Sequence, residues 1–457
     1  MSNEHLFPDA DTAPYTLPLG RDDFRLALRL GHGRAWLHAQ EHGIADRIDD
    51  VVHACLHNLS YDAQCEGDRA EWMIGMVDVA GARELVAPRL FEVIDHPPSE
   101  VGSDWHRIQR CRLLKLLVER GHDEARALLY AALGDDDHSF VLPLGGEEVI
   151  ELDGVAGLIR VCECMGAQLA ANSNYWVDDQ LLDVFDGAHE PGAAEHHLRL
   201  EEDSNESVAR YLRSLGDYRA QQDADEAGQS CSRSVDHGTA DDIIAWVEAA
   251  GLNLIEDDIP GGGHLMVWGR RAPEAELARI VERLQAATEP QHIFGYLRVF
   301  QHRDLPLVDE KVLSFIHHPH ARVRWVAFFA LGRLADPRLR EEAFRSLRPE
   351  MLSEGVLGVL GRNYQPGDHK LIEGALYLPE EVGDVHGIVS DLASAFAECQ
   401  SSEITNLLLF AYEHSPCGNC RRRAIECLST VGALPSWLRL EAGVDAVDEI
   451  RELLQSE

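Results

Sequence analysis

The chain has 457 residues, of which 79 are acidic and 41 are Lys or Arg, so its formal net charge is -38 at pH 7. Hydrophobic residues make up 45% of the sequence and charged residues 26%, which is the mixture of a folded globular protein. The composition therefore argues against a disordered chain, a membrane protein, a secreted disulfide scaffold and a general nucleic-acid binder.

The N-terminal sequence predicts neither secretion nor membrane insertion. No basic residue precedes Arg21, and no apolar run has the length of a signal peptide or a bilayer span. The ten cysteines sit singly or in close pairs within apolar helical patterns, where a free thiol behaves as a small hydrophobic group. We therefore expect a cytoplasmic protein with reduced thiols and no membrane partner.

Helical periodicity dominates the sequence and recurs with a shared outline. In residues 110–121 the apolar side chains Leu113, Leu117 and Val118 fall on one face, and Gly121 ends the pattern. The same outline starts from Arg69, Arg110, Arg324 and Arg421. A spacing shared by four segments indicates an internal repeat, so the sequence predicts an all-α fold.

Residues 318–344, HPHARVRWVAFFALGRLADPRLREEAF, resemble a HEAT repeat of the kind also found in phycobilin lyases. The resemblance lies in the Val323-Arg324 pair, the small residues Ala327 and Ala330, and the Asp336-Pro337 that follows. It implies a bacterial HEAT-like α-solenoid, in which paired helices stack into an α–α superhelix. The two alanines should then face a neighbouring helix, and Arg324 should turn toward an acid or a backbone carbonyl of an adjacent repeat.

The break between domains is predicted at residues 201–235, which are polar, acidic and rich in small residues. We expect an N-terminal HEAT-like array over 1–200, an acidic linker or excursion over 201–235, and a C-terminal HEAT-like array over 236–457. In residues 254–271 two short apolar runs flank Pro-Gly-Gly-Gly, so this stretch predicts either a small β-hairpin insertion or a loop between helices.

The strongest chemical candidate is Cys417-Gly-Asn-Cys420, with His414 three residues before it. A Cys-x-x-Cys at a helix N-terminus lowers a thiol pKa and supplies two ligands to tetrahedral zinc. No second pair follows at zinc-finger spacing, so completion of a metal site requires a ligand from a distant segment. The candidates for that ligand are His369, His386 and Cys399. The sequence alone favours two buried structural thiols, no cofactor and no stoichiometric zinc.

No catalytic constellation is visible, because the P-loop, Gly-x-Ser-x-Gly and His-Glu-x-x-His motifs are missing from the sequence. We therefore expect a non-enzymatic protein-binding scaffold whose acidic surface captures a basic partner. Residues 1–250 carry 48 acids and 20 bases, against 31 and 21 in residues 251–457, so attraction should be strongest in the N-terminal half. The candidate partner-binding residues are Asp135, Asp136, Asp137, Glu201, Glu202 and Asp203.

Polymorphic-toxin loci are one setting for HEAT-like proteins, so by analogy the scaffold is expected to be an immunity or inhibitor protein of a basic toxin or nuclease. One alternative is a repeat-class enzyme, lyase-like or DNA-glycosylase-like, which needs a pocket lined by an acid and an aromatic side chain. Asp336 beside Trp325 is the local hint of such a pocket. The other alternative is a metal- or redox-responsive scaffold that uses Cys417 and Cys420.

Overall fold

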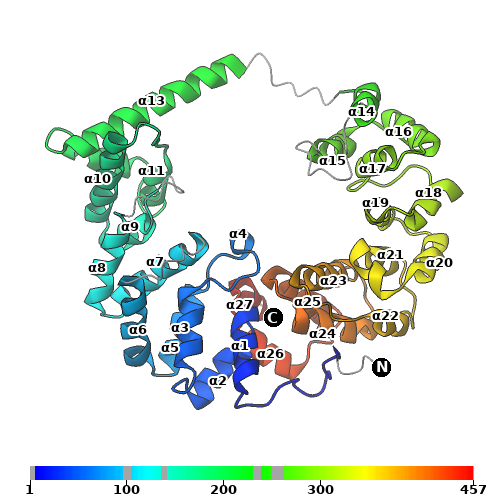
Figure 1. Ribbon diagram of the computed structural model, residues 1–457, viewed down its shortest axis with the longest axis horizontal. Helices are drawn as coiled ribbons and strands as arrows, with labels where there is room; N and C mark the ends of the chain where they lie inside the picture. The colour runs from blue at the N-terminus through cyan, green and yellow to red at the C-terminus, as the bar shows by residue number, and fades with distance from the viewer. Residues whose placement is uncertain (1–5, 96–103, 135–141, 230–237, 250–261, 456–457) are drawn as a thin grey trace. The chain divides into compact units, whose positions relative to one another are not determined.

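The computed structural model describes residues 6–95, 104–134, 142–229, 238–249 and 262–455. These residues form 27 α-helices and a few short 3₁₀ turns, and none of them lies in a β-strand (Figure 1). The predicted all-α fold class is therefore confirmed. Over the same ranges, every helix is too short or too polar to cross a membrane.

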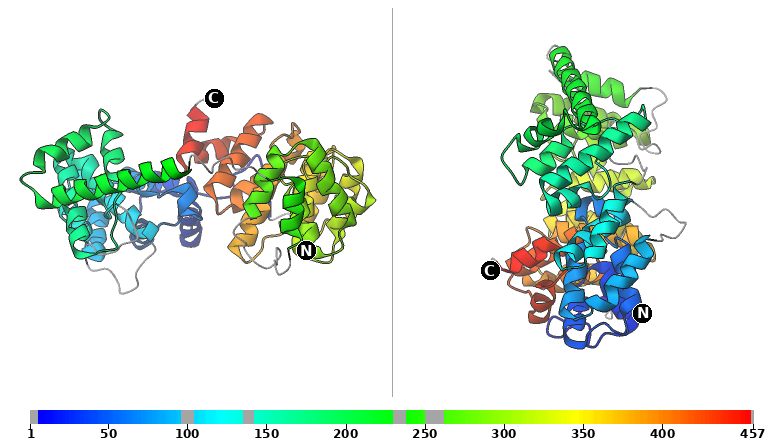
Figure 2. Two further views of the ribbon diagram at one scale, coloured as in Figure 1. Left: turned by 90° about the horizontal axis from the view of Figure 1, so that it is seen from above. Right: turned by 90° about the vertical axis from the view of Figure 1, so that its left-hand side faces the viewer.

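The chain divides into two compact units. The N-terminal unit comprises Leu17–Ser234 with Val444–Ala446, and the C-terminal unit comprises Met1–Thr16, Val235–Gly443 and Val447–Glu457. The boundary after Ser234 falls inside the segment predicted as a linker. Most of that segment nevertheless forms one uninterrupted helix, α13, as Figure 2 shows.

The N-terminal unit contains α1 to α13. Their bounds are α1 (Arg21–Leu30), α2 (Arg34–His42), α3 (Ile48–Leu56), α4 (Ala63–Glu66), α5 (Ala70–Val79), α6 (Arg83–Asp95), α7 (Asp104–Glu119), α8 (Asp123–Ala132), α9 (Gly146–Asp153), α10 (Val155–Ala171), α11 (Gln180–Asp186), α12 (Ala193–Glu201) and α13 (Glu206–Gln229). α5 packs on α7, α7 on α9, and α10 on both α9 and α13.

Helix α1 illustrates why these segments are helical. Asp22 and Asp23 lie in its first turn, where negative charge complements the helix dipole. Phe24 and Leu28, one turn apart, are buried on the same face. The helix ends at Gly31, whose φ of 79° is the left-handed conformation that a glycine adopts at little cost.

The C-terminal unit contains α14 to α27. Their bounds are α14 (Ala240–Val247), α15 (Gly262–Arg271), α16 (Glu274–Ala286), α17 (Pro290–Arg298), α18 (Glu310–Ser314), η2 (Phe315–His317), α19 (Ala321–Leu331), α20 (Pro337–Ser346), η3 (Pro349–Glu354), α21 (Val356–Arg362), α22 (His369–Ala375), α23 (Val382–Ala395), η4 (Ser402–Ile404), α24 (Thr405–His414), α25 (Gly418–Thr430), α26 (Ser436–Ala442) and α27 (Asp448–Gln455). Alternate helices contact each other in series: α17 packs on α19, α19 on α21, α21 on α23, and α23 on α25.

The N-terminal segment of the chain packs on the last helices of the C-terminal unit. The ring of Phe7 lies 5.6 Å from that of Phe410 in α24. The indole N–H of Trp437 in α26 donates a hydrogen bond of 3.2 Å to the Asp9 carbonyl. The start of the chain therefore belongs to the unit that also contains the C-terminus.

The segment predicted as a HEAT repeat forms α19 and α20. Ala327 and Ala330 are fully buried in α19, as expected for positions that touch a neighbouring helix. The guanidinium of Arg324 donates to the carbonyls of His318 and Pro319, each at 3.0 Å. Both carbonyls belong to the same segment as Arg324, so these two bonds close the local turn before α19.

Both alternatives for 254–271, the β-hairpin and the loop between helices, are wrong for the second half of the segment, because Gly262–Arg271 form helix α15. Leu265 and Trp268, three residues apart, are both buried, which is helical spacing. Residues 254–261 lie outside the described residues.

Candidate thiol–imidazole site and adjacent cleft

Two neighbouring helices of the C-terminal unit bring three metal-binding side chains together. Cys417 is the N-cap residue of α25 and Cys420 lies in its first turn. His386 lies on α23, which packs against α25. The ligand atoms of all three lie within 4.8 Å of one another, and Cys420 Sγ is 3.6 Å from His386 Nε2. The two cysteines are only 6% and 4% exposed, whereas His386 is half-buried.

The structure selects one of the distant ligand candidates. His386 joins the two thiols, whereas the ring of His369 pairs with Glu403 at 3.5 Å and Cys399 lines a separate cleft. His414, the nearest histidine in sequence, points elsewhere, with Nε2 2.9 Å from the Leu6 carbonyl. Within the described part of the chain, the cluster has three ligand-type side chains and lacks a fourth.

The two thiols differ in acidity. The pKa of Cys417 is lowered, first because the Cys420 thiol donates a hydrogen bond to it and then because of His386 and the backbone N–H groups of Cys420 and Asn419. The pKa of Cys420 is raised in turn by this pairing with Cys417 and by burial. Ser390, on the same helix as His386, opposes that rise by favouring the Cys420 thiolate. The first proton therefore leaves from Cys417.

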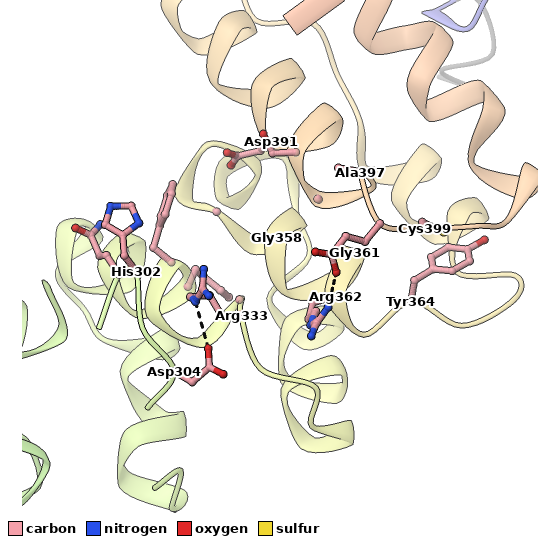
Figure 3. Close-up of a pocket in the computed structure, with 18 of the residues that line it drawn as sticks. His302, Asp304, Arg333, Gly358, Gly361, Arg362, Tyr364, Asp391, Ala397 and Cys399 are labelled. Carbon is pink, nitrogen blue, oxygen red and sulfur yellow. Dashed lines mark hydrogen bonds and ion pairs between the residues drawn. The ribbon is translucent and has the colours of Figure 1, made fainter. Parts of the chain in front are cut away.

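A cleft of about 920 Å³ opens beside this cluster, along the series α19, α21 and α23. Figure 3 shows its lining, which includes Gly358 and Gly361 from α21 and Asp391 from α23. A Cβ atom built on Gly358 would meet no atom within 4 Å, so the space in front of this residue is open. The ring of Phe329, which is 40% exposed, also lines the cleft.

Most charged groups in the cleft neutralise one another. Arg333 pairs with Asp304 at 3.2 Å, and Arg362 pairs with Glu398 at 2.6 Å (Figure 3). Burial and the nearby arginines lower the pKa of His302, so this ring is neutral at pH 7. These groups leave the cleft with little net charge of their own.

Asp391 is the one charged residue of the cleft lining that is not paired with another described residue. Among the described residues, its carboxyl group makes neither a hydrogen bond nor an ion pair. Burial raises its pKa to about 7 because the charged form is poorly solvated, and His386 opposes this only in part. An incoming cation would therefore find in this cleft one carboxyl acceptor that has no partner among the described residues.

The remaining sequence candidates lie elsewhere. Residues 135–137 are outside the described residues. Glu201 and Glu202 lie at the end of α12, in the N-terminal unit. The carboxylate of Glu202 pairs with Arg199 at 3.0 Å, and Asp203 is exposed in the turn that follows the helix. In the C-terminal unit, Asp336 caps α20 and pairs with Arg338 at 2.7 Å.

Asp336, the acid that the sequence suggested for a pocket beside an aromatic side chain, does not line the cleft. The acid and one aromatic side chain that do line it are Asp391 and Phe329. One signal in the sequence marks this position. Asp391 stands beside the apolar residues Ile388 and Leu392 of α23, both of which are buried, so an acid borders the apolar face of its helix.

Comparison with models of protein families finds no match to this chain. Comparisons with curated proteins and with solved structures find no match either.

Proposed function

We propose that the protein is a non-enzymatic binding scaffold, and that the cleft of the C-terminal unit holds a basic side chain of a partner protein. The observation that carries this proposal is the unpaired, half-buried carboxyl of Asp391 in a cleft whose other charges are already paired. A Lys or Arg side chain would supply the missing partner, because a cation beside a buried carboxyl favours its charged form.

The shape of the cleft supports a side chain as the ligand. Its volume of about 920 Å³ lies within the usual range for ligand pockets and admits a side chain with neighbouring backbone. The exposed ring of Phe329 offers an apolar or cation–π surface to the stem or the head of a basic residue.

The whole chain favours a basic partner over an acidic one. Its net charge of -38 attracts cationic proteins at long range and raises their association rate at low salt. The acid cluster from Glu201 to Asp203 would contribute to this attraction, while Asp391 would provide the specific contact. An immunity-type inhibitor of a basic toxin or nuclease is one form that this function would take.

The serial contacts of α17, α19, α21, α23 and α25 support a HEAT-like repeat scaffold as the architecture behind the cleft. In such an array, alternate helices line one face and form an extended binding surface. The cleft is lined by three of these helices, which is the position expected for the binding surface of a repeat protein.

A peptide array tests the proposal. Wild-type protein should retain peptides enriched in Arg or Lys, and Asp391→Asn should lose this enrichment because the amide carries no charge. Asp384→Asn is the matched control, since Asp384 is an exposed acid on the same helix and should leave the enrichment unchanged. Equal retention of basic peptides by the wild-type protein and Asp391→Asn would contradict the assignment.

An enzyme remains the second candidate function because the cleft holds an acid and an aromatic side chain. A carboxyl with a pKa of about 7 is suited to general acid–base catalysis near neutral pH. Ser394, another cleft residue, accepts a hydrogen bond of 3.0 Å from Arg423, so its hydroxyl is engaged in structure. Turnover of a substrate by the wild-type protein but not by Asp391→Asn would favour this candidate over the scaffold.

A further inference from the structure

We propose that His386, Cys417 and Cys420 form a zinc site that ties α23 to the start of α25. This zinc site is separate from the proposed binding of a basic side chain in the cleft and does not depend on it. It also revises the expectation of a zinc-free protein, because the sequence showed only two thiols and one optional histidine, whereas the structure supplies His386 as the third ligand.

The spacing of the ligand atoms fits a tetrahedral metal. Zinc binds thiolate sulfur at about 2.3 Å and imidazole nitrogen at about 2.0–2.1 Å, so a tetrahedral angle places the sulfur and nitrogen about 3.5–3.6 Å apart. The observed distance from Cys420 Sγ to His386 Nε2 is 3.6 Å. All three ligand atoms lie within 4.8 Å of one another, so small side-chain rotations would complete the coordination.

The chemistry of the donors also points to zinc. Two thiolates and one imidazole form a soft set that suits Zn²⁺ better than Mg²⁺ or Ca²⁺, and the two negative charges balance the ion. The start of α25 adds backbone N–H groups directed at Cys417, which favour a thiolate there. Ser390 lies beside Cys420, and a hydroxyl that donates to a ligand sulfur is a common support around a metal.

Three protein ligands leave a fourth coordination position. The described part of the chain places no further His, Cys, Asp or Glu ligand atom within the cluster, so water would complete the tetrahedron. The site links α23 to α25 across 31 residues of sequence, from His386 to Cys417. Because α23 also carries Asp391, the metal would fix the helix that forms one wall of the cleft.

Elemental analysis of the reduced, purified full chain tests the proposal. We expect one zinc ion per chain, lost in His386→Gln and in the double variant Cys417→Ser, Cys420→Ser. Cys399→Ser is the control, since this cysteine lines the cleft outside the cluster and its variant should keep the zinc. Zinc retained by the double variant, or zinc absent from the wild-type protein after reconstitution, would refute the site.

Cobalt substitution keeps the proposal testable if a variant fails to fold. Chelator-treated, reduced wild-type protein titrated with Co²⁺ should develop thiolate-to-cobalt charge transfer and the intense visible bands of a tetrahedral ion at one equivalent. Ser390→Ala should weaken metal binding by about 10–100-fold without removing these bands. A spectrum of octahedral cobalt without thiolate charge transfer would contradict coordination by Cys417 and Cys420.

Discussion

The close contact of α21 with α23 gives the sharpest test of the helix packing that forms the cleft. A Cβ atom built on Gly361 would lie 2.1 Å from the carbonyl oxygen of Ala395 and 2.7 Å from its Cβ. Ordinary contacts begin near 3.4 Å, so Gly361→Ala would require the helices to separate by roughly 1.3 Å or to deform. The atom in the way is backbone and cannot rotate aside.

The expected change in the free energy of unfolding on Gly361→Ala follows from two opposing effects. Alanine gains up to about 1 kcal/mol of helix propensity over glycine, and less near a helix end such as Gly361. Overpacking a tight contact costs about 1–3 kcal/mol, and a backbone clash falls at the upper end of that range. We therefore expect Gly361→Ala to lower the free energy of unfolding of the C-terminal unit by roughly 2 kcal/mol, because the cost exceeds the gain.

Gly358→Ala is the matched control, since Gly358 lies three residues earlier on the same helix and a Cβ there meets nothing within 4 Å. This variant should be neutral or stabilised by up to about 1 kcal/mol. Urea denaturation followed by far-ultraviolet circular dichroism gives both values, and hydrogen exchange locates the change in α21 and α23. Equal effects of the two substitutions would show that the helices do not approach each other closely at Gly361.

Two further predictions concern other parts of the chain. Burial raises the pKa of Glu148, which is 6% exposed in α9, to about 7 from an ordinary 4.5, so the folded state binds more protons than the unfolded state between these values. Stability of the N-terminal unit should therefore fall as pH rises through this window, and Glu148→Gln should remove the loss and stabilise the protein at pH 8 by up to about 3 kcal/mol. Denaturation of both proteins at several pH values checks this, and identical pH profiles would contradict it. Ala330→Leu, at a fully buried position of α19, should destabilise the C-terminal unit by about 1–3 kcal/mol, and an unchanged thermal midpoint would show that α19 is not packed there.

Local patterns were sufficient for some of the helices, but not for α13 or α15, which lie where a linker and a hairpin or loop were expected. The apolar spacing in residues 110–121 and the stop at Gly121 correspond to α7, which ends at Glu119, and Gly121 has a φ of 90°. The Cys-x-x-Cys pair was likewise expected at the start of a helix, and it lies at the start of α25. Each of these features depends on residues only a few positions apart, so periodicity and capping reveal them.

Contacts between distant segments could not be derived in the same way. His386 was one of three ligand candidates that the sequence could not separate, because the choice depends on how α23 packs against α25. The proposed role of Asp391 depends on the pairing of other cleft charges, such as Arg362 with Glu398, which are 36 residues apart. The packing of Phe7 on Phe410 likewise leaves no local signal, so the membership of the N-terminal segment in the C-terminal unit appears only in the structure.

Proton release on binding tests whether a basic side chain pairs with Asp391. With a pKa of about 7 in the free protein, this carboxyl is partly protonated at pH 7, and a bound cation should drive the proton off. Isothermal titration of an Arg-containing peptide from the array at pH 7, in buffers of different ionisation enthalpy, should show net release of protons by the wild-type protein. Asp391→Asn should bind more weakly and release none. Binding with the same proton release in both proteins would contradict the account.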